Sequence, residues 1–196
     1  ASNATTTTLT IPATGVVAGD VIVVSIAIAV DTGTIRCTDS RNNDYGAIAD
    51  VDAMYDEPGP LGVRAGSCAA VATTAMVGGD TITVHHPSTG RRAASASEFT
   101  GFNGSLLRDQ IASGNGKSVT AATQATAATT IAHALLLGTV GIQIRGESYF
   151  PSLNFNDLAG TTTPGGSETT AVSVRPPFKI VSALGRGWST HVAALR

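Results

Sequence analysis

The chain has 196 residues, enough for one sizeable domain with a buried core. Charged residues make up 13% and the formal net charge is −2, so we expect neither a nucleic-acid partner nor a polybasic membrane patch. The longest apolar run, 21–30, is too short to cross a bilayer. Its many Gly, Thr, Ser and Ala residues favour short strands and tight turns over helices.

The first eight residues are polar and rich in threonine, which predicts an N-terminal arm (1–8) or a loosely held edge strand before a single domain (9–196). The strongest strand pattern follows at 20–30. Its even positions from Ile22 to Val30 are all large and aliphatic, whereas its odd positions change from valine to serine and alanine. We therefore expect a central strand with one face in a core and the other packed closely against something thin.

A hairpin is predicted over 78–102, with a strand at 81–86, a turn at 87–90 and a returning strand at 91–100. Before this hairpin, the segment 34–39 is expected to pair with 45–54. The other expected segments of the first half are an exposed loop at 56–62 and a strand at 63–74.

The second half begins with a glycine-rich and asparagine-rich loop at 104–117. Residues 118–130 are expected to be extended rather than helical, because their threonines oppose a helix. A second long central strand is predicted at 131–144 and a loop at 149–166. The remaining strands are expected at 168–175, 178–184 and 188–195, and the Pro176-Pro177 break should lie at an edge or a crossing point. This spacing indicates an all-β fold, a two-sheet antiparallel β-sandwich of jelly-roll-like form.

Two cysteines, Cys37 and Cys68, each lie in a predicted strand. They either form a disulfide between neighbouring strands or remain as two buried thiols that pack as small hydrophobes.

Hard oxygen ligands gather in the turn after the first of these cysteines, with Asp39, Asn42 and Asp44 as weak candidates for a calcium site. The spacing of an EF-hand is absent, and Asn-Asn-Asp is common in ordinary turns. We therefore expect no bound metal and no cofactor.

Catalytic patterns are missing from the sequence. The segment 114–118, GNGKS, lacks the earlier glycine of a phosphate-binding loop, so Lys117 is interpreted as a loop lysine. His85 and His86 are adjacent in a strand and should point to opposite faces, where they cannot share one metal ion. No G-x-S-x-G nucleophile turn occurs. The sequence thus predicts a protein that is not an enzyme.

One resemblance extends over nearly the whole chain from Leu9 onward. The segments GDVIVVSIAI, IRCTDSRNNDYG, AAVATTAMVGGDTITV and AASASEFTGF follow one another in an order that resembles a β-sandwich domain of bacteriophage structural proteins and some bacterial surface proteins. The matching motifs are Gly19-Asp20, Thr38-Asp39-Ser40, Asn43 with Tyr45, Gly79-Asp80-Thr81 and Glu98-Phe99-Thr100-Gly101.

The resemblance implies a virion structural protein, most plausibly a minor capsid or decoration protein on the capsid surface. Its expected partners are the major capsid protein, copies of itself in a homo-oligomer, or both. The alternative on the same fold is a carbohydrate-binding or adhesin module of a phage tail or a bacterial surface protein. That class needs exposed aromatic rings, and one Trp and three Tyr offer few.

The N-terminal residues are the expected contact with such a partner, through Asn3, Thr5, Thr7 and Leu9. A flexible arm can become ordered by adding a strand to a neighbour's exposed edge. The alternative is a frayed terminus without a role.

Overall fold

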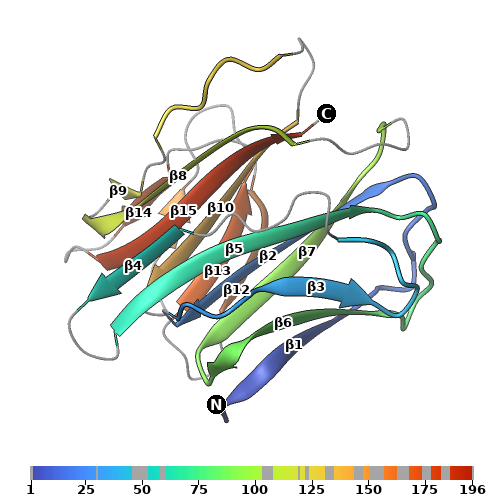
Figure 1. Ribbon diagram of the computed structural model, residues 1–196, viewed down its shortest axis with the longest axis horizontal. Coiled ribbons are helices and arrows are strands. Elements are labelled where there is room, and N and C mark those ends of the chain that lie inside the picture. Colours follow the sequence, from blue (N-terminus) through green and yellow to red (C-terminus); the bar gives the residue numbers. More distant parts are fainter. Residues whose placement is uncertain are drawn as a thin grey trace.

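Figure 1 shows the computed structural model of the chain, in which the described residues form β-strands and no helix. The structure describes residues 2–29, 31–45, 53–57, 61–102, 108–118, 120–121, 124–130, 135–143, 148–150, 157–162, 168–173, 178–181 and 186–195. The strands are β1 (Ala4–Thr10), β2 (Val21–Ala29), β3 (Arg36–Asp39), β4 (Ala53–Glu57), β5 (Leu61–Val71), β6 (Thr81–Thr89), β7 (Arg92–Phe99), β8 (Arg108–Ser118), β9 (Thr120–Ala121), β10 (Leu135–Gln143), β11 (Ser148–Phe150), β12 (Asp157–Thr162), β13 (Glu168–Ser173), β14 (Phe178–Val181) and β15 (Arg186–Leu195).

The strand pairs are antiparallel, and the expected all-β antiparallel sandwich is confirmed. Where two sheets were expected, the described strands form four. We call β1-β6-β3 the outer sheet, β4-β5-β2-β7 the middle sheet and β12-β13-β10-β15-β8 the five-stranded sheet; the fourth has the order β11-β14-β9.

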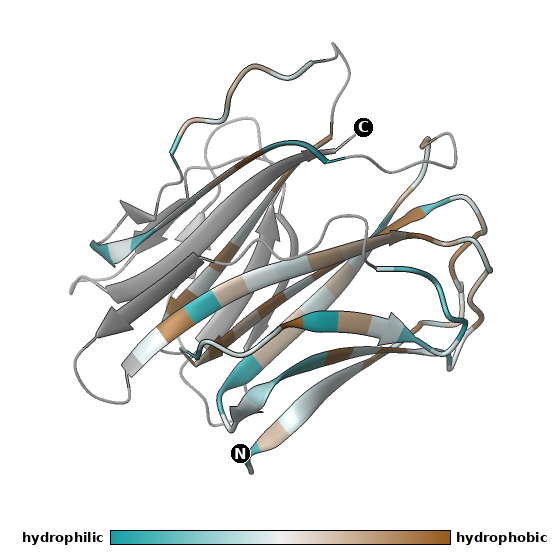
Figure 2. Ribbon diagram, viewed as in Figure 1, coloured by the Kyte–Doolittle hydropathy of each residue, from teal (hydrophilic) through white to brown (hydrophobic). Residues whose placement is uncertain are grey.

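The middle sheet is covered on both faces, so the first three sheets lie in three layers (Figure 1). One face packs against the outer sheet around a large apolar core that includes Ile26, Ile82 and Val84. The opposite face packs against the five-stranded sheet through a smaller cluster that includes Val23 and Leu137. Figure 2 shows hydrophobic colouring along much of β2 and in parts of β5, which also carries a hydrophilic band.

Both faces of β2 are buried, from Val21 to Ile28. The even-numbered residues Ile22, Val24, Ile26 and Ile28 belong to the large core, which confirms the expected burial of this face. The odd-numbered face carries Ser25 and Ala27 and is also buried. The sequence indicated that this face packs closely against another part of the protein, and that part is the five-stranded sheet.

Gly141 of β10 shows how closely the middle and five-stranded sheets approach each other. A Cβ atom at this glycine would lie 3.1 Å from the Cβ of Ala27 and 3.1 Å from a methyl of Val63. It would also lie 3.3 Å from the Cβ of Ala65. Small residues on both sides therefore set the separation of these two layers.

The hairpin predicted over 78–102 is wrong. Strand β6 lies in the outer sheet between β1 and β3, whereas β7 pairs with β2 in the middle sheet. Both sides of β6 are occupied, so no edge is left for β7. The hydroxyl of Thr89 accepts a hydrogen bond from the amide of Arg91, whose carbonyl accepts one from the amide of Ala29 in the middle sheet. The chain thus crosses between sheets at residues 90–91.

The predicted pairing of 34–39 with 45–54 is not found among the described residues, and 46–52 lie outside them. Strand β3 pairs with β6, and β4 pairs with β5. An alternating pattern sets which face of a strand is buried, but it does not choose the neighbouring strand. The predicted loop 56–62 overlaps the ends of β4 and β5, and its central residues 58–60 lie outside the described residues.

The predicted arm is a strand of the domain itself. Strand β1 pairs antiparallel with β6, from Ala4 opposite Thr89 to Thr10 opposite Thr81. It is the last strand of the outer sheet, so of the two alternatives the edge strand is the one observed. Threonine is a good strand residue, and the inward-facing Leu9 packs against the core, which together hold the segment in the sheet.

In the second half, the central strand predicted at 131–144 is confirmed as β10, which lies between β13 and β15. Strands β13 and β14 belong to different sheets, and Pro176-Pro177 between them lie outside the described residues. The two predicted loops are wrong: 104–117 contains most of β8, and 149–166 contains β12. Each of these strands pairs along most of its length with a neighbour, β15 for β8 and β13 for β12, and this pairing supplies the order that local composition lacks.

Candidate functional site

Two turns with the same pattern, Val-x-Gly-Asp, lie beside each other at one end of the sandwich. They span 17–20 and 77–80, and the bridge between Val16 and Met76 joins the chain just before them. In each turn the aspartate amide donates to the valine carbonyl, at 3.2 Å in the first and 3.0 Å in the second. The glycines have φ of 98° and 92°, which this kind of turn requires at its third residue. Val17 and Val77 are left 65% and 55% exposed.

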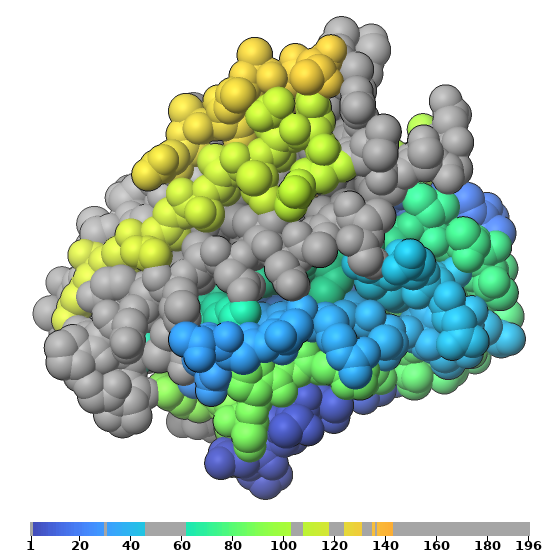
Figure 3. Space-filling model, in the orientation of Figure 1, coloured from blue at the N-terminus to red at the C-terminus, as the bar shows by residue number. Residues whose placement is uncertain are grey.

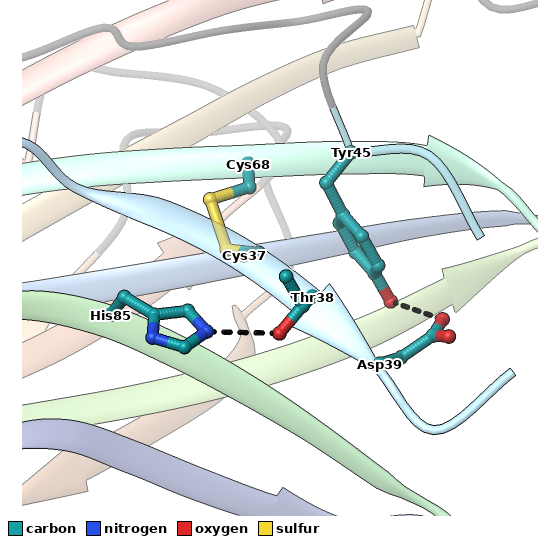
Figure 4. The surroundings of a disulfide bond; sticks show 6 residues. All are labelled: Cys37, Thr38, Asp39, Tyr45, Cys68 and His85. Carbon is teal, nitrogen blue, oxygen red and sulfur yellow. Dashed lines mark hydrogen bonds between the residues drawn. A yellow bond between two sulfur atoms is a disulfide. The ribbon is translucent and has the colours of Figure 1, made fainter. Parts of the chain in front are cut away.

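Asp39 closes the loop that follows β3. Its Oδ1 accepts hydrogen bonds from the amides of Arg41, at 2.8 Å, and Asn43, at 3.1 Å. Its Oδ2 accepts from Nδ2 of Asn43 at 2.9 Å and from the hydroxyl of Tyr45 at 3.2 Å, the latter drawn in Figure 4. Each carboxylate oxygen thus has two donors, and the loop is fixed to the strand end.

The buried Asn43 extends this arrangement to the loop after β5. Its Oδ1 accepts from the amide of Thr74 at 2.8 Å and from the hydroxyl of Thr73 at 3.2 Å. Its Nδ2 donates to the carbonyl of Thr74 at 3.1 Å. Asp39, Asn43 and Tyr45 thus connect the loop after β3 with the loop after β5, and we call these three residues the Asp39 clip. The sequence motif Thr-Asp-Ser followed by Asn and Tyr encodes this connection.

The clip bears directly on the candidate calcium ligands. A cation at Asp39 would have to displace four donors from its carboxylate. Asn42 occupies the turn with φ of 60°, and both Asn42 and Asp44 are exposed. Within the described residues, no group of three or more His, Cys, Asp or Glu side chains is placed to hold a metal ion. The arrangement supports a structural role for these residues.

A cavity of about 430 Å³ lies beside the clip. Burial, together with the Asp39 carboxylate, raises the pKa of Tyr45 far above its ordinary value, so its phenol stays protonated and donates. No histidine is among the lining residues, but the hydroxyl of the lining residue Thr38 lies 3.0 Å from Nε2 of His85. The cavity is lined by Thr34, Ile35, Arg36, Cys37, Thr38, Asp39, Asn42, Asn43, Asp44, Tyr45 and Cys68.

Cys37 and Cys68 form a disulfide in the wall of this cavity, with their Cα atoms 6.1 Å apart (Figure 4). Cys37 comes from β3 of the outer sheet and Cys68 from β5 of the middle sheet. The bond therefore crosses the core between facing sheets, whereas the sequence led us to consider neighbouring strands. It closes a loop with a sequence separation of 31.

His85 and His86 point to opposite faces of β6, as expected. His85 lies on the outer face, 3.0 Å from the hydroxyl of Thr38 (Figure 4). His86 is buried, and its Nδ1 lies 2.8 Å from the carbonyl of Pro87. Because a carbonyl only accepts, Nδ1 carries the proton, and Nε2 accepts from the hydroxyl of Thr7 at 2.9 Å. Burial lowers the pKa of both histidines below the ordinary value.

An exposed ion pair links the second turn to the loop after β3. Nε of Arg41 lies 2.7 Å from Oδ2 of Asp80, and Ser40 donates to Oδ1 of the same carboxylate at 3.0 Å. The hydrogen bond from Arg41 holds the pKa of Asp80 below its ordinary value, with support from the amide of Val77. Sequence reasoning identified Asp80 only as a turn residue; its partner is separated from it by 39 positions, and no local pattern reveals it.

The four residues expected to bind a partner lie in or beside β1. Asn3 and Thr5 are exposed, whereas Thr7 is bound to His86 and Leu9 packs against the core. The predicted loop lysine, Lys117, lies in β8 opposite Gly187 of β15. This segment is an extended strand paired with β15 and not the loop before a helix that binds a phosphate.

No family model, curated protein or solved structure matched the chain when it was compared with each set. In the described part of the chain, no helix is long and apolar enough to span a membrane.

Proposed function

We propose that this chain is a non-enzymatic structural component of a bacteriophage virion, a minor capsid protein of the decoration type on the outer surface of the head. Its partners are then the major capsid protein and further copies of itself. The proposal rests on the ordered motifs that resemble phage structural domains, which account for the turns and the Asp39 clip as parts of one scaffold.

The structural observation that supports the proposal most is the disulfide across the sandwich. Cys37 and Cys68 join two facing sheets through the core, and the middle sheet is enclosed on both sides. Disulfides persist in oxidising surroundings, which include the surfaces of virions and cells. A covalently closed, layered block suits a protein that lies on a lattice outside the cell.

The polar groups at the loop end of the sandwich also favour a structural role. Asp39, Asn43 and Asp80 each hold a loop in place through several hydrogen bonds. Asp80 uses its second oxygen for Arg41 and Val77, so its charge is matched locally. These side chains are engaged in holding loops, which makes them poor candidates for a reaction centre.

A glycan-binding module is the second candidate, and the cavity beside β3 is the observation that favours it. Its threonine hydroxyls and Arg36 could donate to sugar oxygens. Tyr45 is only 5% exposed and its hydroxyl is bound to Asp39, so the one aromatic ring in the lining is not presented for stacking. We therefore rank this function below the virion role.

Electron microscopy of purified particles, from the phage or prophage that encodes the chain, tests the proposal when combined with gold-labelled antibody. Label spread over the heads is expected. Label confined to tail tips, together with binding of the purified protein on a glycan array, would favour the second candidate. Particles that carry no label and no peptide of this chain by mass spectrometry would rule out the virion role.

A further inference from the structure

Strand β1 presents an edge that differs from the other edges of the outer and middle sheets. It spans seven residues, ATTTTLT, and carries no charged side chain and no proline. Natural edge strands are usually protected from pairing by charge, proline or short length. The other edge strands of these two sheets all carry charges: Arg36 and Asp39 in β3, Asp56 and Glu57 in β4, and Arg92 and Glu98 in β7.

The pairing with β6 shows which main-chain groups of β1 face outward. The amide of Ile11 donates to the carbonyl of Asp80 at 2.8 Å, in the same register as the rest of the β1–β6 ladder. Main-chain groups alternate in direction along an antiparallel strand. The amides and carbonyls of Thr8 and Thr10 and the amide of Thr6 therefore point away from β6, up to the bulge between Ala4 and Thr6, and the carbonyl of Thr6 also lies near the ring of His86.

The outward side of β1 has no strand beside it in the described residues. The order of the outer sheet ends at β1 (Figure 1), and Figure 3 shows these residues, in dark blue, along the lower margin of the molecule. The main-chain groups of three consecutive outward positions are thus presented at one margin, where a further strand can bind by main-chain hydrogen bonds.

From these observations we infer that β1 pairs with β1 of a second copy of this chain, antiparallel about a two-fold axis at Thr8. A strand that pairs with its own copy in this way forms an interface closed by symmetry. In this register Thr8 faces its equivalent and Thr6 faces Thr10, and each such pair exchanges two main-chain hydrogen bonds. The two outer sheets become one continuous sheet, β3-β6-β1 followed by the same strands in reverse.

The residues of β1 suit this self-pairing. The facing side chains are all threonines, which pair favourably across antiparallel strands, and no like charges meet at the axis. A groove of about 240 Å³ lies on the inner side of the same edge, between β1 and β7, with Leu9, Ile11 and Ala96 in its lining. The inward-facing Leu9 of the second copy covers the mouth of this groove, which adds apolar contact to the hydrogen bonds.

A closed dimer, and not a fibre, is the expected product. The opposite edge of the outer sheet, β3, has only four residues and carries Arg36 and Asp39, so it does not extend the sheet further. The inference stands apart from the virion proposal, because the purified chain should dimerise in solution whatever larger structure it joins.

Sedimentation velocity of the purified chain over a series of concentrations tests the inference, with a monomer–dimer equilibrium expected. Thr8→Pro removes an outward amide and leaves the bonds to β6 in place. We expect this variant to weaken the dimer by about tenfold or more, because one or more hydrogen bonds are lost. Its melting temperature should equal that of the parent at concentrations at which both are monomeric.

Two lysine variants provide a matched comparison. They test the pairing of β1 with β1 of a second copy even if Thr8→Pro does not fold. Thr8→Lys places two ammonium groups against each other at the axis, so the dimer should weaken and recover in part at high salt. Thr38→Lys puts the same charge on the same face of the outer sheet but on β3, and should dimerise like the parent. A parent that stays monomeric at its highest soluble concentration would overturn the inference. So would folded Thr8 variants that dimerise like the parent, or a Thr38→Lys variant that loses the dimer equally.

Discussion

The hydroxyls of Ser25 and Thr139 share a hydrogen bond of 2.8 Å in the buried space between the middle and five-stranded sheets, although 114 positions separate them in the chain. Ser25 lies on the odd-numbered face of β2, and Thr139 lies on β10 two residues before Gly141. This hydrogen bond joins the two halves of the chain through a layer of small residues. The close approach of the two sheets depends on this hydrogen bond and on Gly141.

Substituting Gly141 tests this close approach. We expect Gly141→Val to lower the free energy of unfolding by about 1–3 kcal/mol, because the added methyls overlap Ala27, Val63 and Ala65. Gly141→Ala should cost less, and combining it with Ala27→Gly should recover part of the loss by removing one of the three contacts. Urea unfolding of the four proteins measures the differences. A Gly141→Val variant as stable as the parent would show that the two sheets are further apart.

The disulfide should contribute substantially to stability. Closing a loop with a sequence separation of 31 predicts a loss of about 3–4 kcal/mol when Cys37 and Cys68 are both replaced by alanine, mainly through the larger entropy of the unfolded chain. Denaturant unfolding with and without a reducing agent measures it. Reduction should destabilise the parent by a similar amount and leave the double variant unchanged; equal sensitivity of both proteins would contradict the prediction.

Ile26 is 1% exposed at the centre of the large core. Ile26→Asp buries an unpaired carboxylate there, and we expect a loss of several kcal/mol or failure to fold. Ile26→Val serves as the control at the same position, with an expected loss of about 0.5–1.5 kcal/mol. Thermal melts followed by circular dichroism compare the two. If the aspartate variant melted within a few degrees of the valine variant, the position of this face of β2 would be wrong.

Stability should fall on mild acidification, through His86 and to a lesser degree His85. The pKa of each is lower in the folded state than the ordinary value of about 6.5, so the unfolded chain binds the proton more readily. The contribution is therefore complete above about pH 6.5 and is lost as the pH drops toward the folded pKa. The nearby charges, Arg92 and Arg36, are both positive and oppose protonation as well.

Melting temperatures measured between about pH 7 and pH 5 check this dependence. His86→Gln should flatten the profile in that range. The loss of stability due to Asp80 belongs to a lower pH range, because the hydrogen bond from Arg41 holds its pKa below the ordinary value of an aspartate. A parent whose melting temperature rose on acidification would contradict the assigned directions of both shifts.

Calcium should not stabilise the protein. Both oxygens of Asp39 are occupied by amide, side-chain amide and phenol donors, so a cation would have to break the Asp39 clip in order to bind. We expect the same melting temperature in millimolar calcium and in chelator, and a loss of about 1–3 kcal/mol for Asp39→Asn, which cannot accept all four bonds. A rise in melting temperature with calcium that Asp39→Asn abolishes would restore the metal hypothesis.

The sequence predicted the fold class and the central strands because β2 and β10 carry strong local patterns. The change from large to small residues along the odd face of β2 even indicated the second covered face. Strand partners were predicted less well. Strands β6 and β7 adjoin in sequence but lie in different sheets, because the partner that a strand takes depends on which sheet edges are already occupied. Strands β8 and β12 have weak patterns and depend on their neighbours, so composition alone suggested loops.

At the candidate site, Asp39 is the one member of the Asp39 clip that was a candidate metal ligand, whereas Asn43 and Tyr45 were named only as motif residues of the resemblance. Oxygen-rich turns look alike in sequence whether their partners are cations or amide groups, and only the positions of Asn43, Thr74 and Tyr45 distinguish the two. A disulfide between Cys37 and Cys68 was one of two alternatives and was considered between neighbouring strands, whereas the observed bond joins facing sheets and depends on the strand order. The contact of Thr7 with His86 spans 79 positions and has no local signature.

The enclosure of the middle sheet limits how this protein can change in evolution. A strand with one solvent face can vary freely at every second position, but β2 has no such face between Val21 and Ile28. Its even positions require large side chains that fill the core. Its odd positions around Ser25 and Ala27 require small side chains, because Gly141 and Thr139 lie directly opposite. New binding properties in this lineage are therefore expected to arise in the turns and at the sheet margins, where substitution leaves both interiors intact.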